Sequence, residues 1–207
     1  MMVKLCGIRR PEDVAYLNEF RPDYAGFVFA GSRRRVSPET AKSLAEKLDA
    51  GIRKAGVFVD EPVESIARTV RTGGLDAVQL HGNESAEVIR SLRMLLPDVE
   101  IWKAVRVRDR FSIPRALELG ADRLLLDSFS ESLYGGTGRK ADWRLIKESN
   151  LRVPFILAGG LNSENMEEAV GELSPWGVDI SSGIETNGVK DRGKIEKIMR
   201  MIRKVGK

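Results

Sequence analysis

The chain has 207 residues, of which 42% are hydrophobic and 31% are charged, and its net charge is +4 at pH 7. This composition is typical of a globular protein with a sizeable core, and so mild a charge of mixed sign argues against nucleic-acid binding. No apolar run approaches the ~20 residues that span a bilayer, and the N-terminus lacks the apolar segment of a signal peptide. The single cysteine, Cys6, cannot form an internal disulfide. We therefore expect a cytoplasmic protein.

Eight short runs rich in apolar and β-branched residues predict β-strands, and most of them are followed by a helical pattern. The predicted strands are residues 3–8, 24–29, 54–59, 77–81, 101–107, 123–127, 153–158 and 178–181. The predicted helices are residues 10–20, 38–48, 62–72, 85–96, 163–173 and 191–204, with shorter ones starting at Pro114 and spanning 143–148. Polar caps and first-turn prolines, as in Ser37-Pro38, mark several of the helix starts.

The strands end at intervals of roughly twenty to thirty residues, which is the length of one strand–loop–helix–loop unit. Eight such units, with no antiparallel hairpin signal, indicate an α/β protein with a parallel sheet. An open doubly wound sheet and a closed barrel both fit this order. The count of eight and the short loops favour a single (β/α)8 TIM barrel that comprises residues 1–207 as one catalytic domain.

Glycine-bearing turns follow the seventh and eighth predicted strands. In such barrels these two turns commonly bind phosphate, because glycine lets backbone N–H groups approach the phosphoryl oxygens. Ordinary tight turns are the alternative for either turn taken alone. The candidate phosphate-binding residues are Gly159, Gly160, Ser181, Ser182 and Gly183.

A third glycine-rich segment, residues 133–142, contains Gly135, Gly136 and Gly138. Gly136, Gly138 and Ala141 have the spacing of a dinucleotide-binding fingerprint, but the segment does not directly follow a strand, and no acidic residue ends a second strand ~20 residues later. We therefore interpret it as a loop that closes over the site. A plain surface loop is the alternative.

Two residues at predicted strand ends are candidates for acid–base chemistry. A lone cysteine is usually a small buried hydrophobic residue, but Cys6 closes the first strand, at the end where such barrels carry their active sites. Asp127 closes the apolar sixth strand, where burial of an acid is unfavourable in free energy unless the acid is paired with another group or takes part in the chemistry. The two residues suit one proton donor and one proton acceptor rather than a metal site.

His81 is the only histidine, so a histidine-rich metal site is excluded. A structural hydrogen bond and a ligand contact are equally good interpretations of His81. Arg34 lies in the run of three arginines at 33–35 and is a candidate for binding a carboxylate, although such runs are more often surface charge. Arg33 and Arg35 are its neighbouring alternatives.

Strand alternation places Lys4 on the same face as Cys6, and Asp179 on the same face as Ser181. The first and eighth strands are neighbours in a closed barrel, so we expect Lys4 to pair with Asp179 inside it. We also hypothesise that the nearby Lys4 favours the thiolate of Cys6.

Short motifs distributed along the whole chain resemble those of the phosphoribosylanthranilate isomerase family of tryptophan biosynthesis. The first, fourth and last of them are specific in combination, whereas the glycine turns are shared with other phosphate-binding barrels. The motifs are Lys4-Leu5-Cys6-Gly7-Ile8, Gly26-Phe27-Val28-Phe29, Ser37-Pro38, Val78-Gln79-Leu80-His81-Gly82, Leu126-Asp127, Gly135-Gly136-Thr137-Gly138, Ala158-Gly159-Gly160-Leu161-Asn162 and Val178-Asp179-Ile180-Ser181-Ser182-Gly183-Ile184-Glu185.

The resemblance implies an Amadori rearrangement of N-(5-phosphoribosyl)anthranilate to 1-(2-carboxyphenylamino)-1-deoxyribulose 5-phosphate. It implies Cys6 as general base, Asp127 as general acid and Arg34 as the ligand of the anthranilate carboxylate. It also implies that Gln79, His81 and Asp179 line the substrate site. The reaction needs no cofactor and no metal.

The expected partner is therefore a small anionic substrate, a sugar phosphate with an aromatic carboxylate, for a monomer or homodimer that binds neither nucleic acid nor membrane. Two other functions fit the residues. The first is that of another sugar-phosphate-binding barrel enzyme, and the second is that of a phosphometabolite-binding protein without catalysis.

Overall fold

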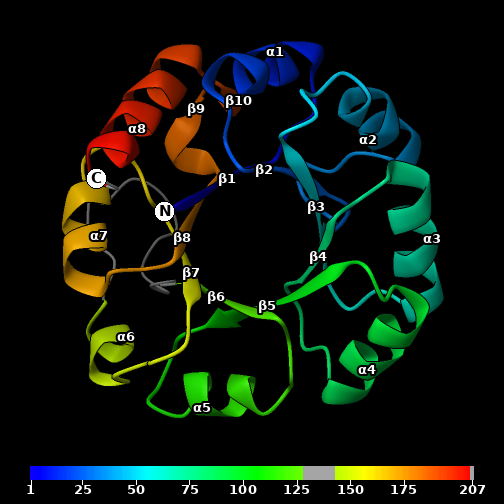
Figure 1. Ribbon diagram of the computed structural model, residues 1–207, viewed down its shortest axis with the longest axis vertical. Coiled ribbons are helices and arrows are strands. Elements are labelled where there is room, and N and C mark those ends of the chain that lie inside the picture. The colour runs from blue at the N-terminus through cyan, green and yellow to red at the C-terminus, as the bar shows by residue number, and fades with distance from the viewer. Residues whose placement is uncertain (128–142, 206–207) are drawn as a thin grey trace.

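The computed structural model describes residues 1–127 and 143–205. Eight parallel strands follow one another in chain order around a closed barrel, in which β8 pairs with β1 (Figure 1). The predicted (β/α)8 barrel is therefore confirmed, and the open doubly wound sheet is wrong. The strands are β1 (Met2–Cys6), β2 (Tyr24–Val28), β3 (Arg53–Phe58), β4 (Ala77–Leu80), β5 (Glu100–Arg106), β6 (Arg123–Asp127), β7 (Phe155–Ala158) and β8 (Gly177–Ile180).

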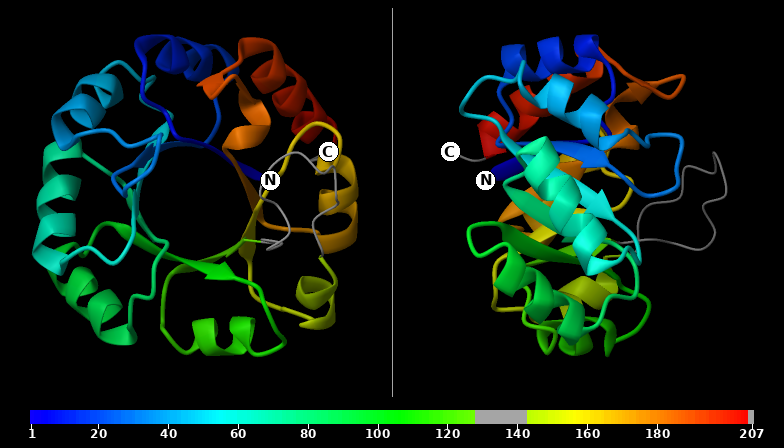
Figure 2. Two further views of the ribbon diagram at one scale, coloured as in Figure 1. Left: turned by 180° about the vertical axis from the view of Figure 1, so that it is seen from behind. Right: turned by 90° about the vertical axis from the view of Figure 1, so that its right-hand side faces the viewer.

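Helices form a ring outside the strands, as the end-on and side views both show (Figures 1 and 2). They are α1 (Pro11–Phe20), α2 (Pro38–Ala45), α3 (Val63–Gly73), α4 (Ala86–Leu95), α5 (Ser112–Leu117), α6 (Arg144–Glu148), α7 (Met166–Leu173) and α8 (Arg192–Val205). Each packs an apolar stripe on the barrel; in α3 the stripe includes Ile66, Ala67 and Val70. Within the described ranges, no helix combines the length and the apolar character needed to cross a membrane.

The helix starts largely follow the predicted signals. Ser37 caps α2, and its hydroxyl accepts a hydrogen bond from the Thr40 amide at 3.1 Å. The predicted start at Pro114 was wrong, because α5 begins at Ser112 and contains Pro114 in its first turn. Proline is tolerated there because the N–H groups of the first turn have no acceptor within the helix.

The structure contains one antiparallel hairpin that was not predicted from the sequence. After β8 the chain makes a short 3₁₀ turn, η1 (Ser182–Ile184), and then pairs β9 (Glu185–Thr186) with β10 (Val189–Lys190). The turn residues Asn187 and Gly188 have φ values of 51° and 76°, and Asn-Gly is the sequence that favours two successive positive φ values. This Asn-Gly hairpin signal is weak in the sequence because each flanking strand has only two residues.

Aromatic side chains fill the barrel at the N-terminal ends of its strands. The rings of Tyr24 and Trp102 meet edge to face with centroids 4.7 Å apart. Glu100 accepts hydrogen bonds from the Trp102 indole at 2.8 Å and from the Tyr24 hydroxyl at 3.2 Å. This end of the barrel is therefore a packed core, and the space for a ligand lies toward the opposite mouth.

Candidate active site

Cys6 and Asp127 end two strands at the same mouth of the barrel. Cys6 is the last residue of β1, and Asp127 is the last residue of β6. Cys6 is buried, whereas the side chain of Asp127 is 18% exposed. The structure therefore brings both predicted acid–base residues to the mouth at which such barrels carry their chemistry.

The Cys6 side chain occupies space left by a glycine on the neighbouring strand. Gly26 of β2 lies directly opposite Cys6, and a Cβ atom built there would lie 2.8 Å from the thiol sulfur. Burial raises the pKa of the Cys6 thiol, and the charge of Lys4 acts in the opposite direction. The hypothesis that Lys4 favours the thiolate has the right sign, but burial outweighs it.

Lys4 is fully buried and pairs with Asp179, as the alternation predicted. Its ammonium lies 2.9 Å from Asp179 Oδ2 and donates to Gln79 Oε1 at 2.7 Å. Burial alone would lower the pKa of Lys4, but Asp179 and Cys6 outweigh it, so the pKa is raised and the ammonium persists. Asp179 Oδ1 is buried and has no hydrogen-bond partner among the described residues.

Gln79 connects this buried cation to His81. The Gln79 amide nitrogen lies 2.9 Å from His81 Nδ1. His81 Nε2 in turn lies 3.5 Å from Asp127 Oδ2. A continuous row of polar groups therefore runs from beside the thiol, across the barrel mouth, to the carboxyl group.

Arg34 is the arginine of the run at 33–35 that turns inward toward this site. Its side chain is 20% exposed, against 63% for Arg33, and Arg35 is exposed. The aliphatic part of the Arg34 side chain passes over Gly7, where a Cβ atom would lie 2.5 Å from Arg34 Cδ, and Gly7 has a φ of +86°. Glycine at position 7 therefore brings the arginine next to Cys6.

The guanidinium of Arg34 is held by a carboxylate that the sequence analysis did not single out. Glu185 accepts from Arg34 Nε and Nη2, both at 2.7 Å, and from Lys190 Nζ at 2.8 Å. Arg33 lies 3.1 Å from the same carboxylate. Burial would raise the pKa of Glu185, but Arg34 and Lys190 lower it to about 2. The overlooked Asn-Gly turn was the signal that could have found the pair Glu185–Lys190, because it sets the two residues opposite each other.

The turns after β7 and β8 lie against each other. A Cβ atom at Gly183 would lie 1.9 Å from the carbonyl oxygen of Leu161, so only glycine fits this approach. Gly159 and Gly160 both have positive φ, at 92° and 66°. Ser181 donates its hydroxyl to the carbonyl of Cys6 at 3.1 Å, so the proton of this hydroxyl is already engaged within the protein.

A second buried ion pair, also not predicted, fixes the loop after β4. Lys103 Nζ lies 2.8 Å from Glu84 Oε2 and donates to the carbonyl of Gly82 at 2.7 Å. Glu84 accepts from the Gly82 amide at 2.9 Å. These contacts hold the backbone next to His81 and so support its place at the mouth.

The predicted closing loop cannot be placed, because Gly135, Gly136 and Gly138 lie outside the described residues. Its closure over the site therefore stays a prediction.

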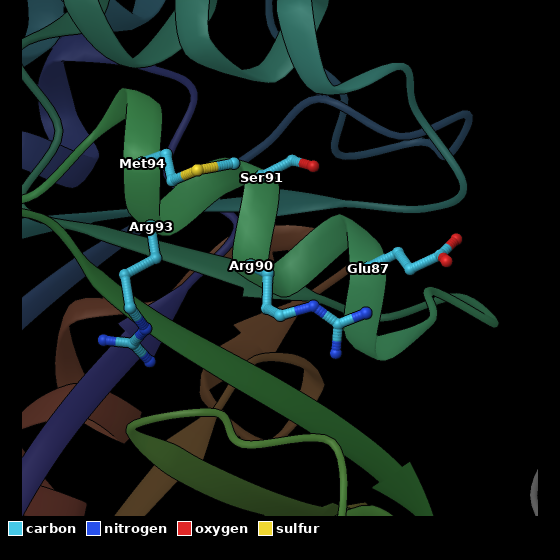
Figure 3. Close-up of a pocket in the computed structure, with 5 residues that line it drawn as sticks. All are labelled: Glu87, Arg90, Ser91, Arg93 and Met94. Atoms are coloured by element: carbon cyan, nitrogen blue, oxygen red, sulfur yellow. The ribbon is translucent and has the colours of Figure 1, made fainter.

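An open groove of about 600 Å³ lies elsewhere, on the outer surface of α4 (Figure 3). Its lining side chains all come from this helix; they are Glu87, Arg90, Ser91, Arg93 and Met94. Because the groove lies on the helix ring and not at the strand ends, we do not assign the reaction to it.

The mouth thus combines three chemical capabilities. A buried thiol beside an ammonium can act as a base once it is ionised, and a partly exposed carboxyl group at the other side can exchange a proton with a ligand. An arginine and two glycine turns supply donors for anionic groups at the periphery. The arrangement suits proton transfer at a small molecule with two anionic groups.

Comparisons with known proteins identify the family of the chain. Residues 3–201 match the family model of N-(5′-phosphoribosyl)anthranilate isomerase. A protein of that name from Acetivibrio thermocellus is 46% identical and aligns over 97% of this chain and 95% of its own length. A crystal structure of phosphoribosyl anthranilate isomerase in complex with reduced 1-(o-carboxyphenylamino)-1-deoxyribulose 5-phosphate superposes with a TM-score of 0.84, at 34% identity and 99% coverage of both chains. A structure of mutually generated monomers of the dimeric enzyme from Thermotoga maritima gives the same TM-score, identity and coverage.

Proposed function

The chain belongs to the N-(5′-phosphoribosyl)anthranilate isomerase family, and as an isomerase of tryptophan biosynthesis it converts N-(5′-phosphoribosyl)anthranilate to 1-(2-carboxyphenylamino)-1-deoxyribulose 5-phosphate; from this premise we propose that Cys6 is its general base and Asp127 its general acid. The observation that carries the assignment is the geometry of the mouth. The thiol and the carboxyl group end β1 and β6 at one opening, each connected to the polar row between them.

The assignment concerns the two proton transfers that begin the rearrangement. Asp127 protonates the furanose ring oxygen, and the bond from C1′ to that oxygen breaks to leave a Schiff base with the anthranilate nitrogen. The thiolate of Cys6 then removes the proton from C2′, which gives an enolamine that becomes the ketone. Positioned acids and bases of this kind each contribute about 10²- to 10⁴-fold to the rate.

Lys4 supports the base in this scheme. Its buried ammonium lowers the pKa of Cys6 against the effect of burial, and it has no acceptor capacity with which to compete for the C2′ proton. Asp179 neutralises the ammonium, and its second oxygen, which lacks a partner among the described residues, is available to a hydroxyl group of the sugar.

We assign the anthranilate carboxylate to Arg34. Its Nε and Nη2 hold Glu185, while Nη1 has no hydrogen-bond partner among the described residues. A carboxylate therefore has one end of the guanidinium to bind, beside Cys6. The phosphate is assigned to the turn at Gly159 and Gly160 and to the turn from Ser181 to Gly183, because a glycine without a side chain lets phosphoryl oxygens approach the backbone closely.

The finer partner assignments follow from these contacts. The ligand is a small sugar phosphate, and we propose that it carries a second anionic group, the aromatic carboxylate, which binds Arg34. We also propose that the barrel acts as one catalytic domain in the cytoplasm, as a monomer or a homodimer, without nucleic-acid or membrane partners.

A fluorescence assay for consumption of phosphoribosylanthranilate tests the assignment. Cys6→Ala and Asp127→Asn should each lower kcat by on the order of 10²-fold or more. Arg34→Met should mainly raise KM, by about 10- to 100-fold, because charged hydrogen bonds are worth about 1.5–3 kcal/mol.

Asp122→Asn is the matched control, because Asp122 lies just before the opposite end of β6 and accepts from the Ile101 amide at 2.7 Å. It should keep wild-type turnover. Wild-type turnover by Cys6→Ala or Asp127→Asn, with the fold intact by circular dichroism, would overturn the assignment.

A further inference from the structure

In the row of polar groups at the barrel mouth, the chemistry of each group determines which atom donates and which accepts each hydrogen bond. Lys4 is completely buried, and an ammonium group has three N–H donors and no acceptor. One of these donors lies 2.7 Å from the side-chain oxygen of Gln79, and another lies 2.9 Å from Asp179. The Gln79 atom that faces Lys4 is therefore the carbonyl oxygen, because the amide nitrogen would set donor against donor.

The orientation of Gln79 decides what His81 receives. With its oxygen on Lys4, the Gln79 amide presents its nitrogen to His81 Nδ1 at 2.9 Å. That nitrogen carries only donors, so Nδ1 must accept. In a neutral imidazole the accepting nitrogen carries no proton, and the ring proton is therefore on Nε2.

We propose that Lys4, acting through Gln79, fixes His81 as the Nε2–H tautomer and thereby presents a hydrogen-bond donor to Asp127. Nε2 lies 3.5 Å from Asp127 Oδ2, longer than an ordinary hydrogen bond, and such contacts commonly shorten when substrate binds. The inference rests on the proposed role of Asp127 and makes Gln79 and His81 positioning residues for it.

This tautomer has two consequences for the reaction. A donor at Nε2 orients the carboxyl group and stabilises the negative charge that remains on Asp127 after it has given its proton to the ring oxygen. The same tautomer excludes His81 as the base, because its one accepting nitrogen is occupied by Gln79. The base therefore has to be another group, which agrees with Cys6.

The same ammonium serves both sides of the site. Lys4 raises the thiolate population of Cys6 on one side and orders the row toward Asp127 on the other. Asp179 neutralises Lys4 beside this row, whereas Lys103 lies on the alternate, helix-facing side of β5, where its ammonium is held by Glu84 and the Gly82 carbonyl. Neither offers an acceptor or donor to His81 Nδ1.

Nuclear magnetic resonance of the ¹⁵N-histidine-labelled protein reads the tautomer directly, because His81 is the only histidine in the chain. We expect the one-bond proton coupling at Nε2 and none at Nδ1. A proton on Nδ1 with a bare Nε2 would overturn the proposal, whatever the activity of the enzyme.

Two variants separate positioning from packing. Gln79→Glu keeps the size and the contact with Lys4 but replaces the donor that faces Nδ1 by a carboxylate oxygen, so the ring proton should move to Nδ1 and kcat should fall about tenfold or more. Asp122→Asn, which changes a carboxyl group just before the opposite end of β6 and outside the row, should leave the tautomer at Nε2. An unchanged tautomer in folded Gln79→Glu would refute the inference.

The wild-type spectrum keeps the inference testable if Gln79→Glu does not fold. Full turnover by Asp127→Asn would refute the role of Asp127 as general acid, but it would not refute the assigned tautomer of His81. Failure of the proposed function and failure of the inference are therefore distinguishable.

Discussion

Replacing Glu185 with glutamine removes the negative charge shared by Arg33, Arg34 and Lys190 while it keeps the size of the side chain. Arg34 and Lys190 hold the pKa of Glu185 at about 2, against an ordinary value of 4.5. That difference of roughly 2.5, at 1.36 kcal/mol per pKa unit, corresponds to about 3 kcal/mol of folding free energy at neutral pH.

The sign of the pH dependence follows from the lowered pKa. A carboxyl group with a lower pKa in the folded protein stabilises it above the unfolded value of 4.5, and this contribution is lost as the pH falls toward 2. The gap in unfolding free energy between the wild type and Glu185→Gln should thus be about 3 kcal/mol at pH 7 and only about 1 kcal/mol at pH 3.

Urea unfolding at pH 7, 5, 4 and 3 measures this gap. The exposed Glu118, for which the described residues provide no ion pair, gives a matched control, and Glu118→Gln should change stability by less than ~0.5 kcal/mol at each pH. Loosening Arg34 should also raise KM in Glu185→Gln. A gap below about 1 kcal/mol at pH 7, or one that does not change with pH, would refute the reasoning.

Three further substitutions test the packing and charge around the site. Gly26→Ala places a Cβ atom 2.8 Å from the Cys6 sulfur and should lower kcat by about tenfold or more in a folded barrel; a normal kcat would show that the thiol does not need its present position. Gly183→Ala places a Cβ atom 1.9 Å from the Leu161 carbonyl and should raise KM by about tenfold and weaken inhibition by inorganic phosphate, whereas unchanged phosphate inhibition would move the phosphate site elsewhere. Lys4→Met removes the charge that lowers the pKa of Cys6, so thiolate formation, followed by ultraviolet absorbance, should shift to higher pH; an unchanged titration contradicts the assigned role of Lys4.

Local patterns were sufficient to predict the strands of the barrel and one buried contact. Parallel strands that are covered on both faces appear in sequence as short apolar runs, and their number and spacing indicate closure. Once β1 and β8 are neighbours, alternation alone places Lys4 next to Asp179, and the structure confirms this pair at 2.9 Å.

The partner of Arg34 could not be predicted from such patterns. Glu185 is 151 residues away from Arg34 in the chain, and both lie beyond the strand ends, where backbone direction depends on turn geometry. The path of Arg34 over Gly7 and the hairpin that carries Glu185 had to be seen in three dimensions. The orientation of Gln79 likewise depends on which atoms of Lys4 and His81 it meets.

The start of α5 shows a smaller limit of the same kind. Proline marks a first turn, but it fits any of the first positions of a helix, so the sequence alone does not distinguish a start at Ser112 from one at Pro114.

The division of labour between Asp127 and Cys6 is tested most directly by the kinetic isotope effect on kcat with substrate deuterated at C2′. If Cys6 removes this proton, Cys6→Ser should show a large primary isotope effect, because proton abstraction has become the slow step. If Asp127 opens the ring first, Asp127→Asn should show almost no isotope effect, because ring opening then limits turnover. The reverse pattern, with a large effect in Asp127→Asn and none in Cys6→Ser, would contradict the assigned roles.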